Sequence, residues 1–216
     1  MKNLTVKEIF ALAIQNHQKN NLTAAKDLYN KILEIRPDFA SAHNNLGVVF
    51  EKLEQPQKAI DCYKKAIQID PNYADAQYNL GNAFIKQNEP KKAISYYEKV
   101  IQINSNRADV YNNLGVIFRN LGENQKAISC YEKAIQIDPN YVNAYNNLGT
   151  ILGDLNRINE AKKNFEKSLN LNPNKKETYH NFGIILFKLN QHSKALEYIR
   201  KGTGLIRFGQ KDFKII

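Results

Sequence analysis

The chain is poor in cysteine, methionine and tryptophan. It has no tryptophan, one methionine and two cysteines, Cys62 and Cys130, among 216 residues. Two cysteines are too few for a disulfide framework, so we expect free thiols, as in a reducing compartment. The 10 glycines and 6 prolines are also too few for a low-complexity chain. The composition therefore favours a folded protein whose stability comes from an apolar core.

Long apolar segments are missing as well. No run of apolar residues approaches the length that spans a membrane. Near the N-terminus, Lys7 and Glu8 interrupt what would be the apolar part of a signal peptide. Thr5 and Glu8 instead have the spacing of a capping box, which predicts the start of a helix. We expect a cytoplasmic protein that has no membrane partner.

The sequence also lacks a recognisable catalytic or metal-binding pattern. No histidine has metal-ligand spacing with a cysteine or carboxylate, and the segment Gly202–Gly204 lacks the ending of a phosphate-binding loop. The net charge is +10, but no basic helix carries base-reading side chains. We therefore expect no enzyme activity, no cofactor, no metal and no nucleic-acid partner.

What the sequence does contain is an internal repeat of 34 residues. The same residue types recur with this period in four columns. These columns are leucine or phenylalanine at Leu46, Leu80, Leu114, Leu148 and Phe182; glycine at Gly47, Gly81, Gly115, Gly149 and Gly183; alanine at Ala25, Ala59, Ala93, Ala127, Ala161 and Ala195; and an aromatic residue at Tyr29, Tyr63, Tyr97, Tyr131 and Phe165. Such regularity predicts one small structural unit repeated along the chain.

Each repeat reads as two amphipathic helices joined by a polar turn. In the fourth copy, Tyr111, Leu114 and Phe118 form one apolar stripe, and a second stripe follows the turn at Gly122. Gly115 is expected to let the second helix approach closely at its small Ala127. Pro56 and Pro90 stand where second helices should begin, since a missing amide hydrogen costs little there.

This pattern resembles the tetratricopeptide repeat. The resemblance implies an all-α fold, an α-solenoid in which six tandem helix-turn-helix repeats form a right-handed superhelix whose first helices line a concave groove. The expected repeats are Val6–Phe39, Ala40–Tyr73, Ala74–Arg107, Ala108–Tyr141, Val142–Lys175 and a divergent Lys176–Gly209, followed by a tail at 210–216.

A column of asparagines is the candidate binding site. One asparagine precedes the packing leucine or phenylalanine in five repeats, at Asn45, Asn79, Asn113, Asn147 and Asn181. We call these five residues the asparagine ladder and expect them to face the groove. A carboxamide carries a donor and an acceptor, as a peptide group does, so the ladder is suited to an extended backbone. The residues expected beside it are Asn44, Tyr78, Asn82, Asn112 and Asn146.

Two functions fit this groove. The first is a non-catalytic scaffold that binds extended peptide segments of partner proteins. The second follows from a resemblance of the ladder to the superhelical region of O-linked N-acetylglucosamine transferases, which implies a targeting subunit or fragment of a protein glycosyltransferase. A third interpretation is that the ladder binds no peptide and that its polar side chains only keep the groove hydrated.

The repeat does not account for the C-terminal segment LIRFGQKDFKII. Its apolar residues either cover the exposed edge of the last helix pair or mediate self-association. The partners expected from the sequence are thus a protein or peptide and a second copy of the chain.

Overall fold

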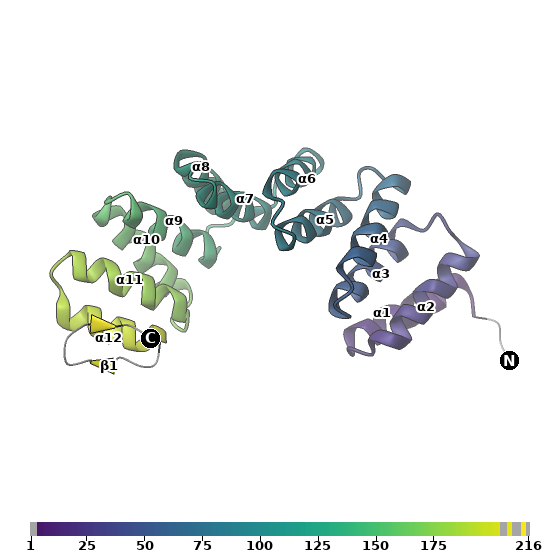
Figure 1. Cartoon of the computed structure of the whole chain (residues 1–216), viewed down its shortest axis with the longest axis horizontal. Coiled ribbons are helices and arrows are strands. Elements are labelled where there is room, and N and C mark those ends of the chain that lie inside the picture. Colours follow the sequence, from purple (N-terminus) through teal and green to yellow (C-terminus); the bar gives the residue numbers. More distant parts are fainter. Residues whose placement is uncertain (1–3, 204–206, 209–212, 215–216) are drawn as a thin grey trace. The chain divides into compact units, whose positions relative to one another are not determined.

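The computed structural model describes residues 4–203, 207–208 and 213–214. The chain forms two compact units, Met1–Ser105 and Asn106–Ile216. In the described part of each unit, three pairs of antiparallel helices follow one another (Figure 1). The prediction of an all-helical array of helix-turn-helix pairs is confirmed for residues 6–203.

The N-terminal unit contains six helices of similar length. They are α1 (Val6–Gln18), α2 (Leu22–Ile35), α3 (Ala40–Lys52), α4 (Pro56–Ile69), α5 (Ala74–Lys86) and α6 (Pro90–Ile103). Each odd-numbered helix packs against the next even-numbered one, and α2 and α4 also contact the helix that follows them. The three pairs therefore share one continuous interior.

The C-terminal unit repeats this arrangement. Its helices are α7 (Ala108–Asn120), α8 (Asn124–Ile137), α9 (Val142–Asp154), α10 (Ile158–Leu171), α11 (Lys176–Lys188) and α12 (His192–Thr203). One buried apolar cluster extends from Ala127 on α8 to Ala195 on α12. Since no isolated helix pair could bury both of its faces, this shared core explains why the repeats occur in tandem.

Local sequence signals determine where the helices begin and end. Thr5 and Glu8 form the predicted capping box at the start of α1, and Pro56 and Pro90 are the first residues of α4 and α6. The turn inside each pair holds one residue with positive φ, which asparagine and glycine adopt most readily. These residues are Asn20, Glu54, Asn88, Gly122, Asn156 and Asn190.

At four of its five positions, the recurring glycine of the first helix lies against an aromatic ring of the second helix; Gly183 lies against Ile199 instead. A Cβ added at Gly115 would be 2.5 Å from Cε1 of Tyr131, and one at Gly149 would be 2.9 Å from Cε1 of Phe165. The expectation of close approach is correct, and the atoms nearest to such a Cβ at Gly115 belong to the Tyr131 ring. Because these rings are fully buried, the glycine provides the space in which the ring packs.

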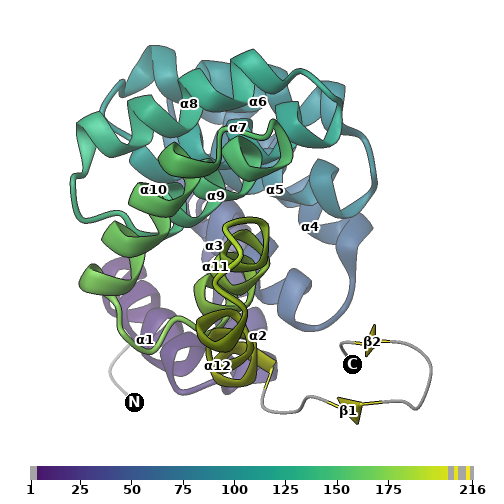
Figure 2. The ribbon, with the colours of Figure 1, turned by 90° about the vertical axis from the view of Figure 1, so that its left-hand side faces the viewer.

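The C-terminal segment contains a short strand pair that the sequence did not predict. β1 (Arg207–Phe208) and β2 (Phe213–Lys214) pair in antiparallel register after α12 (Figure 2). Helix α12 ends at Thr203. The predicted cap and the predicted self-association both concern side chains of residues 205–216, which lie outside those that the structure describes. Among the described helices, none has the length and apolar character needed to cross a bilayer.

Candidate peptide-binding surface

The asparagine ladder lies on neighbouring first helices within each unit. In the N-terminal unit α3 contacts α5, and in the C-terminal unit α9 contacts both α7 and α11. All five ladder side chains are half-buried at these contacts. They are therefore accessible, and each also lies close to a first helix of a neighbouring pair.

In the N-terminal unit, ladder asparagines are joined through a buried asparagine. Nδ2 of Asn79 on α5 donates to Oδ1 of Asn44 on α3 at 2.9 Å. Nδ2 of Asn44 in turn donates to Oδ1 of its neighbour Asn45 at 3.3 Å. The carboxamides of two successive repeats are thus held in one directed chain of hydrogen bonds.

The C-terminal unit has the same bond at two successive contacts. Nδ2 of Asn147 donates to Oδ1 of Asn112 at 2.9 Å. Nδ2 of Asn181 donates to Oδ1 of Asn146 at 3.3 Å and to Oγ1 of Thr150 at 3.2 Å. At all three of these contacts, the later repeat donates and the earlier repeat accepts, so the bond orients each donating carboxamide in the same sense.

The residues predicted beside the ladder divide into two groups. Asn44, Asn112 and Asn146 are only 5%, 6% and 1% exposed, so their side chains are part of the packing between repeats. Tyr78 and Asn82 are half-buried. The ring of Tyr78 packs on that of Tyr97, whose hydroxyl donates to Oδ1 of Asn82. Contact of any of these residues with a ligand stays a prediction, and burial makes the three asparagines the poorest candidates.

Charged residues near the ladder of the C-terminal unit are partly balanced. Nε and Nη2 of Arg107 donate to the two carboxylate oxygens of Asp109 at 2.9 and 2.7 Å. Burial raises the pKa of the Asp109 carboxyl, but the hydrogen bonds and charge of Arg107 outweigh it and hold the pKa below its usual value. Nζ of Lys175 lies 3.4 Å from Oε2 of Glu177. These ion pairs offset the negative charge of Asp109 and Glu177.

Comparison with known proteins identifies the repeat. Models described as tetratricopeptide repeat match residues 40–73, 74–107 and 108–141, and also 130–163 and 164–197; a further TPR repeat model matches 16–54. The chain belongs to the tetratricopeptide repeat family. Tetratricopeptide repeat proteins typically mediate protein–protein interactions. No curated protein sequence gives a significant match.

Several solved tetratricopeptide repeat structures are similar to this chain. The MamA protein is 30% identical, with a TM-score of 0.68 over 77% of this chain and 91% of MamA. PilF of Pseudomonas aeruginosa is 29% identical, with a TM-score of 0.69 over 77% of each chain. YrrB, described as a TPR protein with an unusual peptide-binding site, is 22% identical, with a TM-score of 0.66 over 82% of this chain and 91% of YrrB. At that identity the likeness to YrrB shows the fold alone. The resemblance to O-linked N-acetylglucosamine transferases stays a prediction.

Neither cysteine forms a disulfide. Cys62 and Cys130 are free, and burial raises the pKa of each thiol to about 11. At neutral pH both are therefore protonated and weakly nucleophilic. In the part of the chain that the structure describes, no group of three or more histidine, cysteine or acidic residues could hold a metal.

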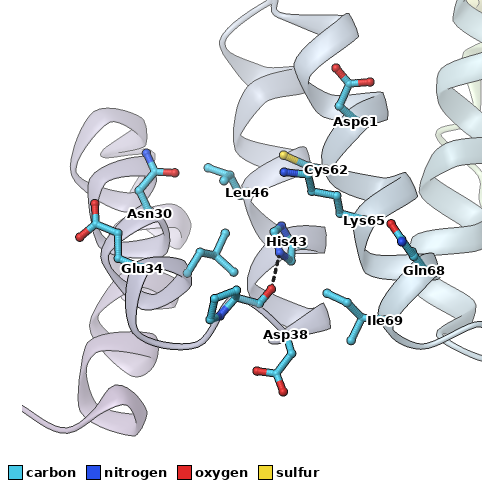
Figure 3. Close-up of a pocket in the computed structure, with 12 residues that line it drawn as sticks. Asn30, Glu34, Asp38, His43, Leu46, Asp61, Cys62, Lys65, Gln68 and Ile69 are labelled. Atoms are coloured by element: carbon cyan, nitrogen blue, oxygen red, sulfur yellow. Dashed lines mark hydrogen bonds between the residues drawn. The ribbon is translucent and has the colours of Figure 1, made fainter.

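A second surface feature was not predicted from the sequence. A pocket of about 890 Å³, which we call the first pocket, lies between α2 and α4 of the N-terminal unit, with α3 at its floor (Figure 3). His43 of α3 lies centrally in it, and its Nε2 donates to the carbonyl oxygen of Pro37 at 2.9 Å. Burial lowers the pKa of His43 although this hydrogen bond opposes the effect, so the ring is neutral at pH 7.

The first pocket and the ladder lie on different sides of α3. His43 and Leu46 line the pocket, whereas Asn45 belongs to the ladder. Successive helical residues are about 100° apart, so Asn45 points about 160° away from His43 around the axis. The pocket therefore offers a surface distinct from the groove that the sequence indicated.

Proposed function

We propose that this chain is a non-catalytic interaction scaffold that holds extended segments of partner proteins against its first helices through the asparagine ladder. The main support is the hydrogen bond from Asn147 to the buried Asn112, repeated from Asn79 to Asn44 and from Asn181 to Asn146. A carboxamide fixed in this way is preorganised, so less conformational entropy is lost when a ligand binds.

The fixed carboxamide keeps the groups that a peptide backbone needs. An asparagine amide has two N–H donors and one carbonyl oxygen. At Asn147 one N–H bonds to Asn112, which leaves the second N–H and Oδ1 for a ligand. Those two groups complement the C=O and N–H of one peptide unit. Asn181 uses its amide nitrogen on both Asn146 and Thr150, so Oδ1 is its main group for recognition.

Side chains beside the ladder give the surface some selectivity. In the C-terminal unit Val116 and Ile184 are 38% and 42% exposed, unusually open for aliphatic residues. They occupy equivalent positions on α7 and α11, one turn after Asn112 and His180. A peptide that alternates small apolar and polar side chains would contact both the carboxamides and these aliphatic groups.

The ladder can be tested by substitution in the C-terminal unit. Asn113→Ala combined with Asn147→Ala should weaken binding of extended peptides by about ten-fold, because two carboxamide contacts are lost. Binding would be measured by fluorescence polarisation with a peptide selected from an array against the parent protein. Circular dichroism would establish that the variant is folded.

The matched control makes the same chemical change on a second helix. Asn159→Ala with Asn170→Ala removes two exposed carboxamides from α10. This variant should bind as the parent does. Equal affinity of the ladder variant and the parent would rule out the ladder as the recognition element, whatever else the protein binds.

A further inference from the structure

The first pocket has a counterpart one repeat later, and the two differ in chemistry. The second pocket, of about 570 Å³, is lined by Ile67, Pro71, Asn72, Gln77, Lys99, Gln102 and Ile103. Each of these residues lies 34 positions after a residue that lines the first pocket. Even the floor is equivalent, because Nε2 of Gln77 donates to the Pro71 carbonyl oxygen at 3.0 Å as His43 does to Pro37. The scaffold of the two pockets is therefore the same.

The rim of the first pocket carries three acidic residues whose counterparts in the next repeat are uncharged. Glu34, Asp38 and Asp61 line it, and the residues 34 positions later are Gln68, Asn72 and Ser95. One lysine, Lys65, lines the first pocket, and Lys99 lines the second. Three carboxylates and one lysine give the first rim a formal charge of −2, in a protein whose net charge is +10.

The carboxylates at this rim are not neutralised by the protein. Among the residues that the structure describes, no ion pair joins Glu34, Asp38 or Asp61 to a basic side chain, and Asp61 accepts a hydrogen bond only from Nε2 of Gln57 at 3.1 Å. The walls carry them from two sides, Glu34 from α2 and Asp61 from α4 (Figure 3). A cationic ligand in the pocket would therefore meet negative charge on both sides.

A small residue keeps the first pocket open. Cys62 lines it, and Tyr96 stands at the equivalent position of the next repeat. The ring of Tyr96 stacks on Phe84 with centroids 5.5 Å apart, and Phe50 is the counterpart of Phe84. A tyrosine at residue 62 would thus have an aromatic partner to stack on. The smaller side chain of Cys62 lines the first pocket together with the apolar side chains of Leu33, Leu46 and Ile69.

From this combination we infer that the first pocket is a second docking site, which binds a segment of a partner protein carrying lysine or arginine beside a large aliphatic side chain. The aliphatic group fills the space above Leu33, Leu46 and Ile69, and the cationic groups pair with Glu34, Asp38 and Asp61. A volume near 890 Å³ lies within the range of about 300–1,000 Å³ usual for ligand sites, and it accommodates several side chains. The site works independently of the ladder.

Three labelled peptides test the chemistry of the occupant. One alternates lysine with leucine, one glutamate with leucine, and one lysine with serine. Only the lysine–leucine peptide should bind in fluorescence polarisation, and its affinity should fall as salt is added. Equal binding of the glutamate–leucine peptide would overturn the charge argument, and equal binding of the lysine–serine peptide would overturn the apolar one.

Two variants place the peptide in the pocket. Glu34→Gln with Asp38→Asn and Asp61→Ser gives these three positions the side chains found 34 residues later, and should weaken the lysine–leucine peptide by about ten-fold or more. Cys62→Tyr should weaken it to a similar extent by filling the space. Because both changes copy a neighbouring repeat, the fold should be retained, as circular dichroism would verify.

The control has the same change in net charge at a different surface. Glu98→Gln with Glu132→Gln and Glu166→Gln neutralises exposed carboxylates on α6, α8 and α10 and should leave binding unchanged. Equal weakening by this control, or full binding by both pocket variants, would overturn the proposal. Loss of binding in the ladder variant Asn113→Ala with Asn147→Ala would likewise assign the peptide to the groove instead.

A chemical readout locates the peptide independently of affinity. In a Cys130→Ser background, Cys62 is the only thiol of the chain. Bound lysine–leucine peptide should slow alkylation of Cys62, and the glutamate–leucine peptide should not. An unchanged alkylation rate at saturating lysine–leucine peptide would show that it binds elsewhere.

Discussion

The interior of the helix pairs and the gaps between second helices differ in how strictly they repeat. Inside four pairs the same contact recurs, a glycine against an aromatic ring, from Gly47 and Tyr63 to Gly149 and Phe165. The first and second pockets instead share a scaffold but differ in charge and size. Residues that keep the 34-residue period thus build the fold and the ladder, whereas residues that depart from it distinguish the first pocket from the second.

The largest expected effect comes from a change inside a helix pair. Gly115→Ala should lower the free energy of unfolding by about 1–3 kcal/mol, because its Cβ would lie 2.5 Å from Cε1 of the buried Tyr131 ring. The gain in helix propensity, about 1 kcal/mol, offsets only part of this cost. Urea unfolding followed by circular dichroism measures the difference.

Gly149→Ala is the matched comparison for this prediction. There the added Cβ would be 2.9 Å from Cε1 of Phe165, so a smaller shift of the ring suffices. Its destabilisation should be the lesser of the two. A Gly115 variant as stable as the parent would mean that the ring contact does not limit this position.

An effect of similar size is expected where first helices of successive repeats meet. Asn112→Ala should cost about 1–3 kcal/mol, because it removes the acceptor of Asn147 from a buried position. A double-mutant cycle with Asn147→Ala isolates the hydrogen bond, for which we expect a coupling on the order of 1 kcal/mol. Strictly additive effects would show that the bond contributes nothing to the packing between repeats.

The smallest effect should be a gain of stability in a turn. Glu54 has φ of 57°, whereas the equivalent turns place Asn20, Asn88, Asn156 and Asn190 at similar angles. Glu54→Asn should therefore stabilise the protein by about 0.5–1 kcal/mol, since asparagine tolerates this conformation better. Thermal unfolding provides the measurement, and Asn88→Ala, which should destabilise, is the reverse control. An unchanged melting temperature for Glu54→Asn would mean that glutamate adopts this positive-φ conformation at no cost in stability.

Much of the fold could be predicted from the sequence because every repeat carries the same signals. The capping box of Thr5 and Glu8, the prolines at 56 and 90 and the alternating apolar stripes each act within a few residues. Because the same signals recur in each repeat, the helices assigned to one copy are supported by those assigned to the others. The contact between Gly115 and the Tyr131 ring was not predicted, because it depends on side-chain direction between two helices.

The candidate sites were less predictable because accessibility depends on packing between repeats. The sequence placed Asn113 in the ladder and Asn112 beside it as a further groove residue, yet Asn112 is 6% exposed whereas Asn113 is half-buried. The first pocket was missed altogether, although its signal was present. Glu34, Asp38 and Asp61 depart from the amides and serine of the next repeat, but only the packing of α2 and α4 brings these three residues to one pocket.

The sequence by itself determined the repeat, its period and the alternation of first and second helices, because propensity, capping and amphipathic spacing are local properties. Only the tertiary structure decided which asparagine of each pair is buried, which side chain lies against each recurring glycine, and that Glu34 of α2 and Asp61 of α4 line one pocket. Those outcomes depend on how helices from different repeats approach each other, and the period alone does not specify that approach.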